Sequence, residues 1–179
     1  MRNTPGTIYT IGHSTLSIAG FTNILKIHGI ALLADVRTVP RSRFNPQFNK
    51  DTFPRDLRDA GIAYEHFPGL GGLRHSNLKE SPNSGWRSAA FRSYADYMMT
   101  PQFEASLDQL QGAAMTRRTA IMCAEAVPWR CHRNLISDAL TVRGFHVMHI
   151  VGEKGIHEHA VTAWARVSGT DITYPAQDA

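Results

Sequence analysis

The chain has 179 residues, of which 42% are hydrophobic and 19% are charged, and its formal net charge is +4. This length favours one domain with a single core, and the composition is typical of a soluble globular protein. No apolar run approaches the roughly 18 residues of a membrane helix, and residues 1–6 lack the apolar segment of an export signal. Because the chain has two cysteines and no disulfide framework, we expect a cytoplasmic protein without a membrane partner.

Predicted strands and helices alternate along the chain. Residues 7–11 are β-branched and aromatic, which predicts a first strand. Ser17 is placed as the N-cap of a helix with apolar residues at helical spacing, and Gly29 fits its end. The nearly all-apolar residues 30–36 predict a strand that is covered on both faces. The later predicted elements are a helix at 51–60, a strand at 62–67, helices at 86–99 and 101–111, a strand at 119–122, a helix at 134–140 and a strand at 145–151.

This alternation predicts a doubly wound α/β domain, with a mostly parallel sheet of about five strands and helices on both faces. We expect one domain over residues 1–179, with a core at about 7–166 and a frayed tail from about 168. In such a sheet, ligands bind outside the carboxyl ends of the strands.

Ionisable residues and glycines follow nearly every predicted strand. These residues are Gly12 and His13, Asp35 and Arg37, the loop 40–50 with Arg43 and Asn45, the glycines Gly69 and Gly71, and Cys123 with Glu125. Together with Arg133, the arginines Arg37 and Arg43 could clamp a phosphate or carboxylate. The alternative is that several arginines only make the surface soluble.

Both cysteines lie between a predicted strand and a predicted helix. Cys131 stands at the helix start beside arginines, where a thiol has a lowered pKa and is partly ionised. Glu125, His132 or His13 could then act as the acid or base. In the alternative reading, Cys123 packs as a small hydrophobe and Cys131 caps the helix.

Two other interpretations of the cysteine region fit less well. Cysteine phosphatases and rhodaneses place their arginine one residue closer to the cysteine than Arg130 stands from Cys123. A zinc or iron site is a further alternative, and its candidate ligands are Cys123, Cys131, His132, His13 and His159. The spacing of the cysteines, however, is not the C-x(2–4)-C of structural zinc. We interpret His149, His157 and His159 as a solvated or capping group, and we predict no metal ligands and no particular cofactor.

The loop 41–50 interleaves basic residues with Phe44 and Phe48. This pattern suits bases stacked beside phosphates, although the two phenylalanines could instead anchor the loop to the core. Residues 69–72 permit close backbone approach to a ligand, but they match no dinucleotide or P-loop motif, and a turn without a ligand is an equal alternative.

Several of these segments together resemble the DUF488 family, a bacterial and archaeal domain of unknown function. The matching segments are residues 10–14, 35–37, 42–46 with 48–49, 68–72, 123–125 and 131–133. The resemblance covers about residues 7–166 and implies an α/β fold whose site is formed by these loops, without a settled reaction. Where the family often has a His-Pro pair, this chain has His159 followed by Ala160.

We therefore expect an enzyme, a hydrolase or transferase of unknown reaction, that acts on a small anionic or nucleotide-like substrate. The expected catalytic residues are Glu125, Cys131, His13 and Cys123. The expected substrate-binding residues are Arg37, Arg43, Asn45, Gly69, Gly71, His132, Arg133 and Asp35. The first alternative is a nucleic-acid-binding accessory module, and the second is a metal-binding or redox protein. The oligomeric state is left open.

Overall fold

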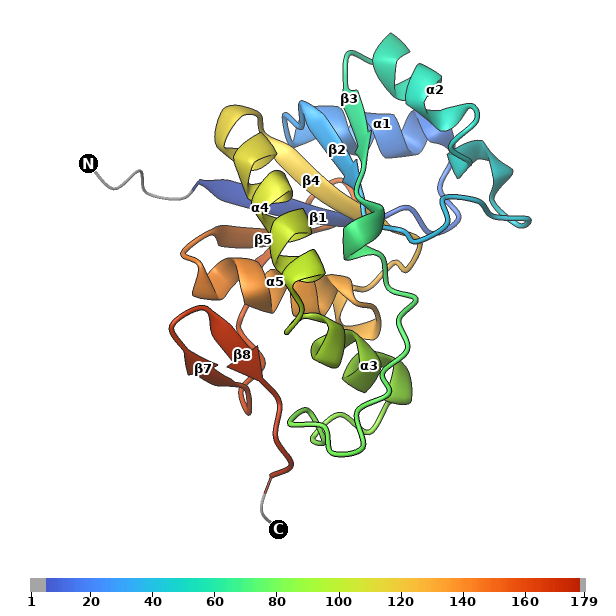
Figure 1. Cartoon of the computed structure of the whole chain (residues 1–179). Helices are drawn as coiled ribbons and strands as arrows, with labels where there is room; N and C mark the ends of the chain where they lie inside the picture. The colour runs from blue at the N-terminus through green and yellow to red at the C-terminus, as the bar shows by residue number, and fades with distance from the viewer. Residues whose placement is uncertain (1–5, 178–179) are drawn as a thin grey trace.

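The computed structural model describes residues 6–177, which are built around a six-stranded sheet (Figure 1). The strands follow the spatial order β3-β2-β4-β1-β5-β6. Five strands are parallel, and the edge strand β6 runs antiparallel to β5. In chain order they are β1 (Thr7–Gly12), β2 (Leu32–Asp35), β3 (Ala63–His66), β4 (Thr119–Cys123), β5 (His146–Val151) and β6 (Gly155–Glu158). The predicted mostly parallel sheet is confirmed, with one strand more than expected.

Helices cover both faces of the sheet, as the doubly wound fold class predicts. They are α1 (Ile18–Ile27), α2 (Phe53–Asp59), α3 (Ala89–Tyr97), α4 (Pro101–Thr116) and α5 (Arg133–Val142). The chain moves toward one edge from β1 to β3 and back across the sheet from β3 to β5, and right-handed crossovers in opposite directions place their helices on opposite faces. Within residues 6–177, none of these helices has the length and apolar sequence that crossing a bilayer requires.

Alternate residues of the central strands enter two separate cores. Tyr9 and Ile11 of β1 belong to the core formed with α1 and α2, whereas Ile8 belongs to the core formed with α3, α4 and α5. The side-chain alternation of a strand explains this division. Both faces of β1 and β4 are therefore buried, and the free ends of these two strands provide a rigid base for the loops that follow them.

The end of the chain corrects the expectation of a frayed tail from residue 168. A hairpin of β7 (Arg166–Ser168) and β8 (Asp171–Thr173) brings Tyr174 into the core, where it is fully buried. Its hydroxyl donates to Asp138 at 2.8 Å, and its backbone N–H donates to Asn83 at 2.9 Å. The strands are only three residues long, so their sequence carries no periodic signal.

The loop after β4 lies across the end of β1. The backbone N–H groups of His13 and Ser14 donate to the carbonyls of Cys123 and Ala124, both at 3.0 Å. A Cβ atom on Gly12 would lie 1.8 Å from the backbone oxygen of Glu125. Only glycine fits at this position, because the obstacle is backbone that is held by its own hydrogen bonds.

Replacing Gly12 with alanine should therefore lower the free energy of unfolding by about 3 kcal/mol or more. The matched control is Gly112→Ala, in an exposed part of α4 where an added Cβ meets no atom within 4 Å. That substitution should raise stability by about 0.5–1 kcal/mol, because alanine favours helix interiors. Urea denaturation of both variants measures the difference, and a Gly12→Ala protein as stable as the unmodified chain would contradict the close approach.

Candidate functional site

A cavity of about 560 Å³ lies at the carboxyl ends of β2 and β4. The helices that follow these two neighbouring strands cover opposite faces of the sheet. Open α/β sheets bind ligands at the strand ends where the helices change face in this way. One wall of the cavity is apolar and comes from α3 and α5, with Phe91, Tyr94 and Leu135. The two cysteines line it further in, and the exposed Arg41, Arg130 and Glu125 also line it.

Both cysteines are free thiols, and their sulfur atoms lie 3.2 Å apart. Cys123 ends the buried strand β4, and Cys131 follows the 3-10 turn Pro128–Arg130 at the start of α5. The Nε–H of Arg133 points at both sulfurs, at 2.9 Å from Cys123 and 3.2 Å from Cys131. The backbone N–H of Arg133 approaches the sulfur of Cys131 at 3.4 Å.

The two thiols have opposite pKa shifts. The hydrogen bond from the Cys123 thiol, helped by the Arg133 guanidinium, lowers the pKa of Cys131 to about 6. Burial raises the pKa of Cys123 well above its ordinary value. At neutral pH, Cys131 is therefore the thiolate and Cys123 the thiol that donates to it.

Arg133 is 1% exposed, and its guanidinium connects the thiols to a second row of buried polar groups. It donates to the backbone carbonyl of Glu125 and, at 3.3 Å, to the hydroxyl of Thr10. The Thr10 hydroxyl in turn lies 2.7 Å from Nδ1 of His149. A buried guanidinium needs such partners, because leaving its charge unpaired would cost several kcal/mol.

The row continues from His149 to Asp138 through His159. Nε2 of His149 lies 2.9 Å from Nδ1 of His159, and Nε2 of His159 lies 2.7 Å from the Asp138 carboxylate. Burial lowers the pKa of His149 to about 4, so this ring is neutral at physiological pH. With both rings protonated on Nε2, every hydrogen bond points from Arg133 toward Asp138. The interpretation of the three histidines as a solvated or capping group is wrong for His149 and His159, which are buried within this row; His157 is exposed.

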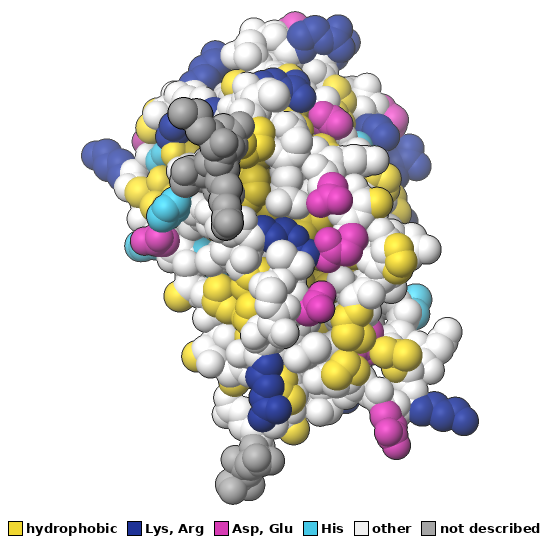
Figure 2. Space-filling view, turned by 60° about the vertical axis from the view of Figure 1, so that its left-hand side comes forward, with side chains coloured by type: hydrophobic (Ala, Val, Ile, Leu, Met, Phe, Trp, Pro, Cys, Tyr) yellow, Lys and Arg dark blue, Asp and Glu magenta, His cyan; other side chains and the backbone are white. Residues whose placement is uncertain are grey.

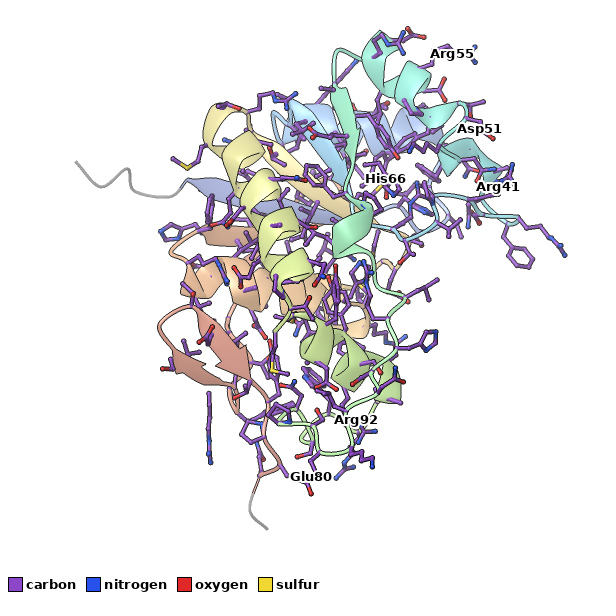
Figure 3. The ribbon with its side chains drawn as sticks, viewed as in Figure 1. Arg41, Asp51, Arg55, His66, Glu80 and Arg92 are labelled. Atoms are coloured by element: carbon purple, nitrogen blue, oxygen red, sulfur yellow. The ribbon has the colours of Figure 1, made fainter. Side chains whose placement is uncertain are left out.

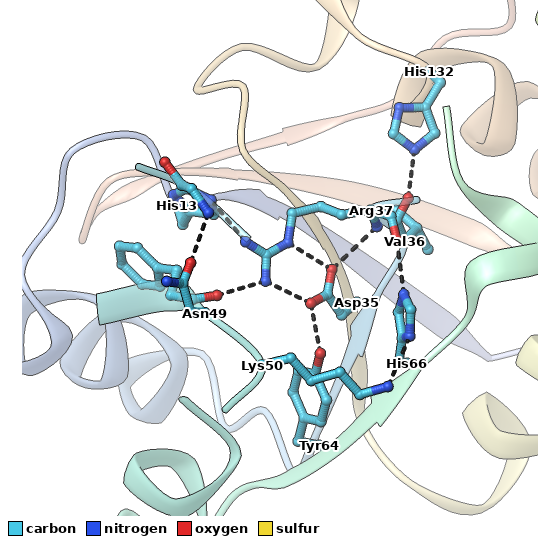
Figure 4. A network of polar contacts seen from close by, with 11 residues as sticks. His13, Asp35, Val36, Arg37, Asn49, Lys50, Tyr64, His66 and His132 are labelled. Atoms are coloured by element: carbon cyan, nitrogen blue, oxygen red, sulfur yellow. Dashed lines mark hydrogen bonds and ion pairs between the residues drawn. The ribbon is translucent and has the colours of Figure 1, made fainter. Parts of the chain in front are cut away.

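A second buried network lies on the other side of the cavity (Figure 4). Arg37 forms a two-pronged ion pair with Asp35, at 2.9 Å from Nε and 2.7 Å from Nη2. The same guanidinium donates to the backbone carbonyl of Phe48 at 2.8 Å. Asp35 is fully buried and also accepts the Tyr64 hydroxyl at 2.7 Å. Arg37 is thus neutralised within the protein.

His13 lines the cavity, but both of its ring nitrogens have partners. Nδ1 lies 2.8 Å from the Ser14 carbonyl, and Nε2 lies 3.3 Å from Nη1 of Arg37. Its ring stacks on Phe48 at 4.2 Å. Burial lowers the pKa of His13 to about 4, so the ring is neutral and holds the Arg37 network in place.

His132 also lines the cavity and joins its two sides. Its Nε2 lies 2.8 Å from the carbonyl of Val36, directly after β2 (Figure 4). Burial lowers the pKa of His132 to about 4, and the ring lies 5.2 Å from that of Tyr94. The start of α5 is thereby tied to the loop after β2.

The three arginines that the sequence suggests as an anion clamp do not converge. Arg37 is paired with Asp35, and Arg133 is held by the thiols and Thr10. Arg43 is exposed on the outer loop, away from the cavity lining. Arg37 still lines the cavity, but its charge is already paired, so the exposed cationic groups there are Arg41 and Arg130. A guanidinium nitrogen of Arg41 lies 3.6 Å from the Asp51 carboxylate on the outer surface (Figure 3).

Within residues 69–72, Gly69 and Gly71 serve packing, whereas Gly72 lines the cavity. A Cβ on Gly69 would lie 1.9 Å from the Ser106 hydroxyl of α4, and one on Gly71 would lie 2.4 Å from the Thr38 hydroxyl. The Tyr97 hydroxyl also donates to the Gly69 carbonyl at 2.6 Å. Gly69 and Gly71 do not line the cavity. Asn45 does not line it either, and its backbone N–H donates to the Ser42 hydroxyl at 3.0 Å.

A family model described as "Domain of unknown function DUF488" matches residues 17–140. The chain belongs to the DUF488 family. Comparison with curated proteins and with solved structures finds no match to this chain. The matched residues include β2, β3, β4 and both cysteines, so the DUF488 match covers most of the cavity.

Within residues 6–177 of this DUF488 protein, no group of three or more histidine, cysteine or acidic side chains is arranged to hold a metal ion. Sequence reasoning missed Thr10 and Asp138, and also the apolar cavity wall of Phe91, Tyr94 and Leu135. Apolar residues at helical spacing indicate a core face, and no local signal distinguishes a core face from a ligand wall.

Breaking the buried ion pair by Asp35→Asn should lower the free energy of unfolding by about 3–5 kcal/mol, because it leaves the Arg37 charge buried without its carboxylate. The matched control is Asp51→Asn, which breaks the exposed ion pair with Arg41 and should cost less than about 1 kcal/mol. Thermal and urea denaturation check both values. Equal effects of the two substitutions would show that the buried pair does not organise this side of the cavity.

Proposed function

We infer that this DUF488 protein is an enzyme in which the Cys131 thiolate attacks a small anionic substrate bound in the cavity. One observation carries the inference: the sulfurs of Cys131 and Cys123 lie 3.2 Å apart, with Nε of Arg133 within 3.2 Å of each, beside a cavity large enough for a small molecule. A thiol that donates a hydrogen bond and a nearby guanidinium both stabilise a thiolate, which is the nucleophilic form of cysteine. Two cysteines without a disulfide framework also fit a cytoplasmic location.

The cavity lining supports a substrate with an apolar or aromatic body and an anionic end. Phe91, Tyr94 and Leu135 would cover the body, while Arg41 and Arg130 would attract the charge. Substrates of this kind include nucleotide-like molecules. Arg43 and Asn45 lie outside the cavity lining and have no role in this proposal.

Glu125 is the residue best placed to move a proton. It lines the cavity and is exposed, and its Oε1 accepts the backbone N–H of Ala126 at 3.0 Å. An adduct on Cys131 would pass to water in a hydrolase or to a second substrate in a transferase, and either step needs a base beside the sulfur.

Alkylation of Cys131 at varied pH tests this proposal, with iodoacetate as the anionic reagent and iodoacetamide as the neutral one. The rate should fall only below about pH 6, where the thiolate takes up its proton. At about pH 5, Cys131 should react with iodoacetamide roughly tenfold faster than a free thiol, since its larger ionised fraction outweighs the lower nucleophilicity of a low-pKa thiolate. Iodoacetate should be favoured several-fold over iodoacetamide, relative to a free thiol.

Matched variants separate the nucleophile from the anion site. Cys131→Ser should abolish alkylation, and Cys123→Ala should move the half-maximal rate to higher pH by removing the thiol donor. Arg130→Gln with Arg41→Gln should remove the preference for iodoacetate and leave the pH dependence unchanged. A Cys131 that reacts only near the pH of a free thiol would refute the nucleophile.

A second candidate function, nucleic-acid binding, has one observation in its favour. Phe44 is 89% exposed beside the exposed Arg43, whereas Phe48 is buried against His13. The face shown in Figure 2 carries acidic and basic side chains together, and the observation that favours nucleic-acid binding comes from the outer loop. Single-stranded RNA should then bind at low salt and be released steeply as salt is added, and Phe44→Ala should weaken binding by about 1–3 kcal/mol. Absence of binding at low salt would exclude this function.

A further inference from the structure

We propose that Cys123 is a second reacting thiol, and that the site exchanges with small anionic disulfides by closing a disulfide bond between Cys123 and Cys131. The proposal deepens the proposed function and depends on it for the nucleophile, Cys131. It adds the substrate class, disulfides of low molecular weight, and a role for the buried thiol.

The positions of the two sulfurs carry the proposal. Their separation of 3.2 Å exceeds the S–S bond length of about 2.05 Å by roughly 1 Å. Cys123 is fixed on the central strand β4, whereas Cys131 follows a single 3-10 turn at the end of the connecting loop. A small movement of the loop would therefore be enough to form the bond.

The two thiols differ in access. Cys123 is 3% exposed, whereas Cys131 is partly exposed at the cavity. A reagent in the cavity meets the more exposed Cys131 first, and the sulfur of Cys123 lies 3.2 Å from the sulfur that would carry the adduct. This is the arrangement of an attacking thiol and a resolving thiol.

The exchange balances in two steps. The Cys131 thiolate attacks one sulfur of R–S–S–R, which breaks the S–S bond, forms Cys131–S–S–R and releases R–S⁻. Cys123 then gives its proton to the released thiolate and attacks the sulfur of Cys131, which forms the internal disulfide and expels the second R–S⁻. The substrate gains two electrons and the cysteine pair loses two. An external dithiol returns the pair to the reduced form.

Arg133 should make this disulfide easy to reduce. Its guanidinium stabilises the thiolate and hence the reduced pair, and a neutral disulfide offers it no comparable partner. A stabilised reduced form raises the reduction potential of a disulfide. The contacts of Arg133 with Thr10 and with the Glu125 carbonyl do not depend on the charge of the thiols, so the side chain would keep its position in either state.

Dithiobis(nitrobenzoate), an aromatic and anionic disulfide, is a suitable probe because it matches the chemistry of the cavity. The unmodified protein should release about two equivalents of thionitrobenzoate and keep no adduct, so that its intact mass falls by two hydrogens. The chain has two cysteines, so no other thiol contributes. Cys123→Ser should release about one equivalent and retain a mixed disulfide on Cys131, and Cys131→Ser should react at least about tenfold more slowly.

The intact mass of the unmodified protein decides the outcome without any variant. A protein that keeps one or two nitrobenzoate adducts would overturn the resolving role of Cys123. If iodoacetate still alkylates Cys131 with half-maximal rate near pH 6, the proposed function survives that result; if it does not, both fail.

Equilibration with glutathione buffers measures the influence of Arg133. Arg133→Met should make the internal disulfide about tenfold or more harder to reduce, and Arg133→Lys, which keeps the charge, should lie between Arg133→Met and the unmodified protein. An unchanged equilibrium in a folded Arg133→Met protein would show that the guanidinium does not set the potential.

Discussion

The buried guanidinium of Arg133 is the interaction on which the site depends. It lies between the two sulfurs, the hydroxyl of Thr10 and the carbonyl of Glu125, and so joins α5 to β1, to β4 and to the loop that crosses Gly12. A charge in this position would be expensive without partners, and it fixes the geometry of every group that neutralises it. Arg133 thereby positions the thiols and holds the loop between them.

The ion pair of Arg37 with Asp35 holds the opposite side of the cavity in a comparable way. Here the charge is balanced by a carboxylate of the same strand end, and His13 and Tyr64 complete the hydrogen bonds. The two buried arginines have different consequences, because a carboxylate is a permanent anion whereas a thiolate can react. Arg37 gives a rigid wall, and Arg133 gives a wall that contains a thiol of lowered pKa.

The sequence was sufficient for the parallel strands but not for β6, β7 and β8, and it pointed to the sheet edge at which the candidate cavity lies. Alternating apolar runs and helical spacing predicted the parallel strands, and the groups that follow β1, β2 and β4 do line one cavity. The hydrogen-bond partners of the arginines were harder to predict from the sequence. The row that begins at Arg133 includes Thr10 and His149, which are far from it in sequence, and Asp138, which lies on another face of the same helix. No local sequence pattern indicates that these residues are connected to Arg133. The Asp35–Arg37 pair did have a local signal, since residues two apart at a strand end lie on the same side.

The direction of the hydrogen bonds in the row from Arg133 to Asp138 explains why the protonation of Cys131 matters for folding. His149 is neutral, so the Asp138 carboxylate compensates Arg133 only at a distance, whereas the sulfur of Cys131 lies 3.2 Å from Nε of Arg133. A thiol whose pKa is lowered on folding adds stability above its ordinary pKa and loses it as the pH falls through about 6. The raised pKa of Cys123 has the opposite effect, because its contribution is present below the ordinary thiol pKa and disappears as the pH rises beyond it. The contribution of the pair to stability is therefore greatest near the ordinary thiol pKa, where one proton is shared by two sulfurs. This is also the protonation state that the proposed exchange with disulfides requires.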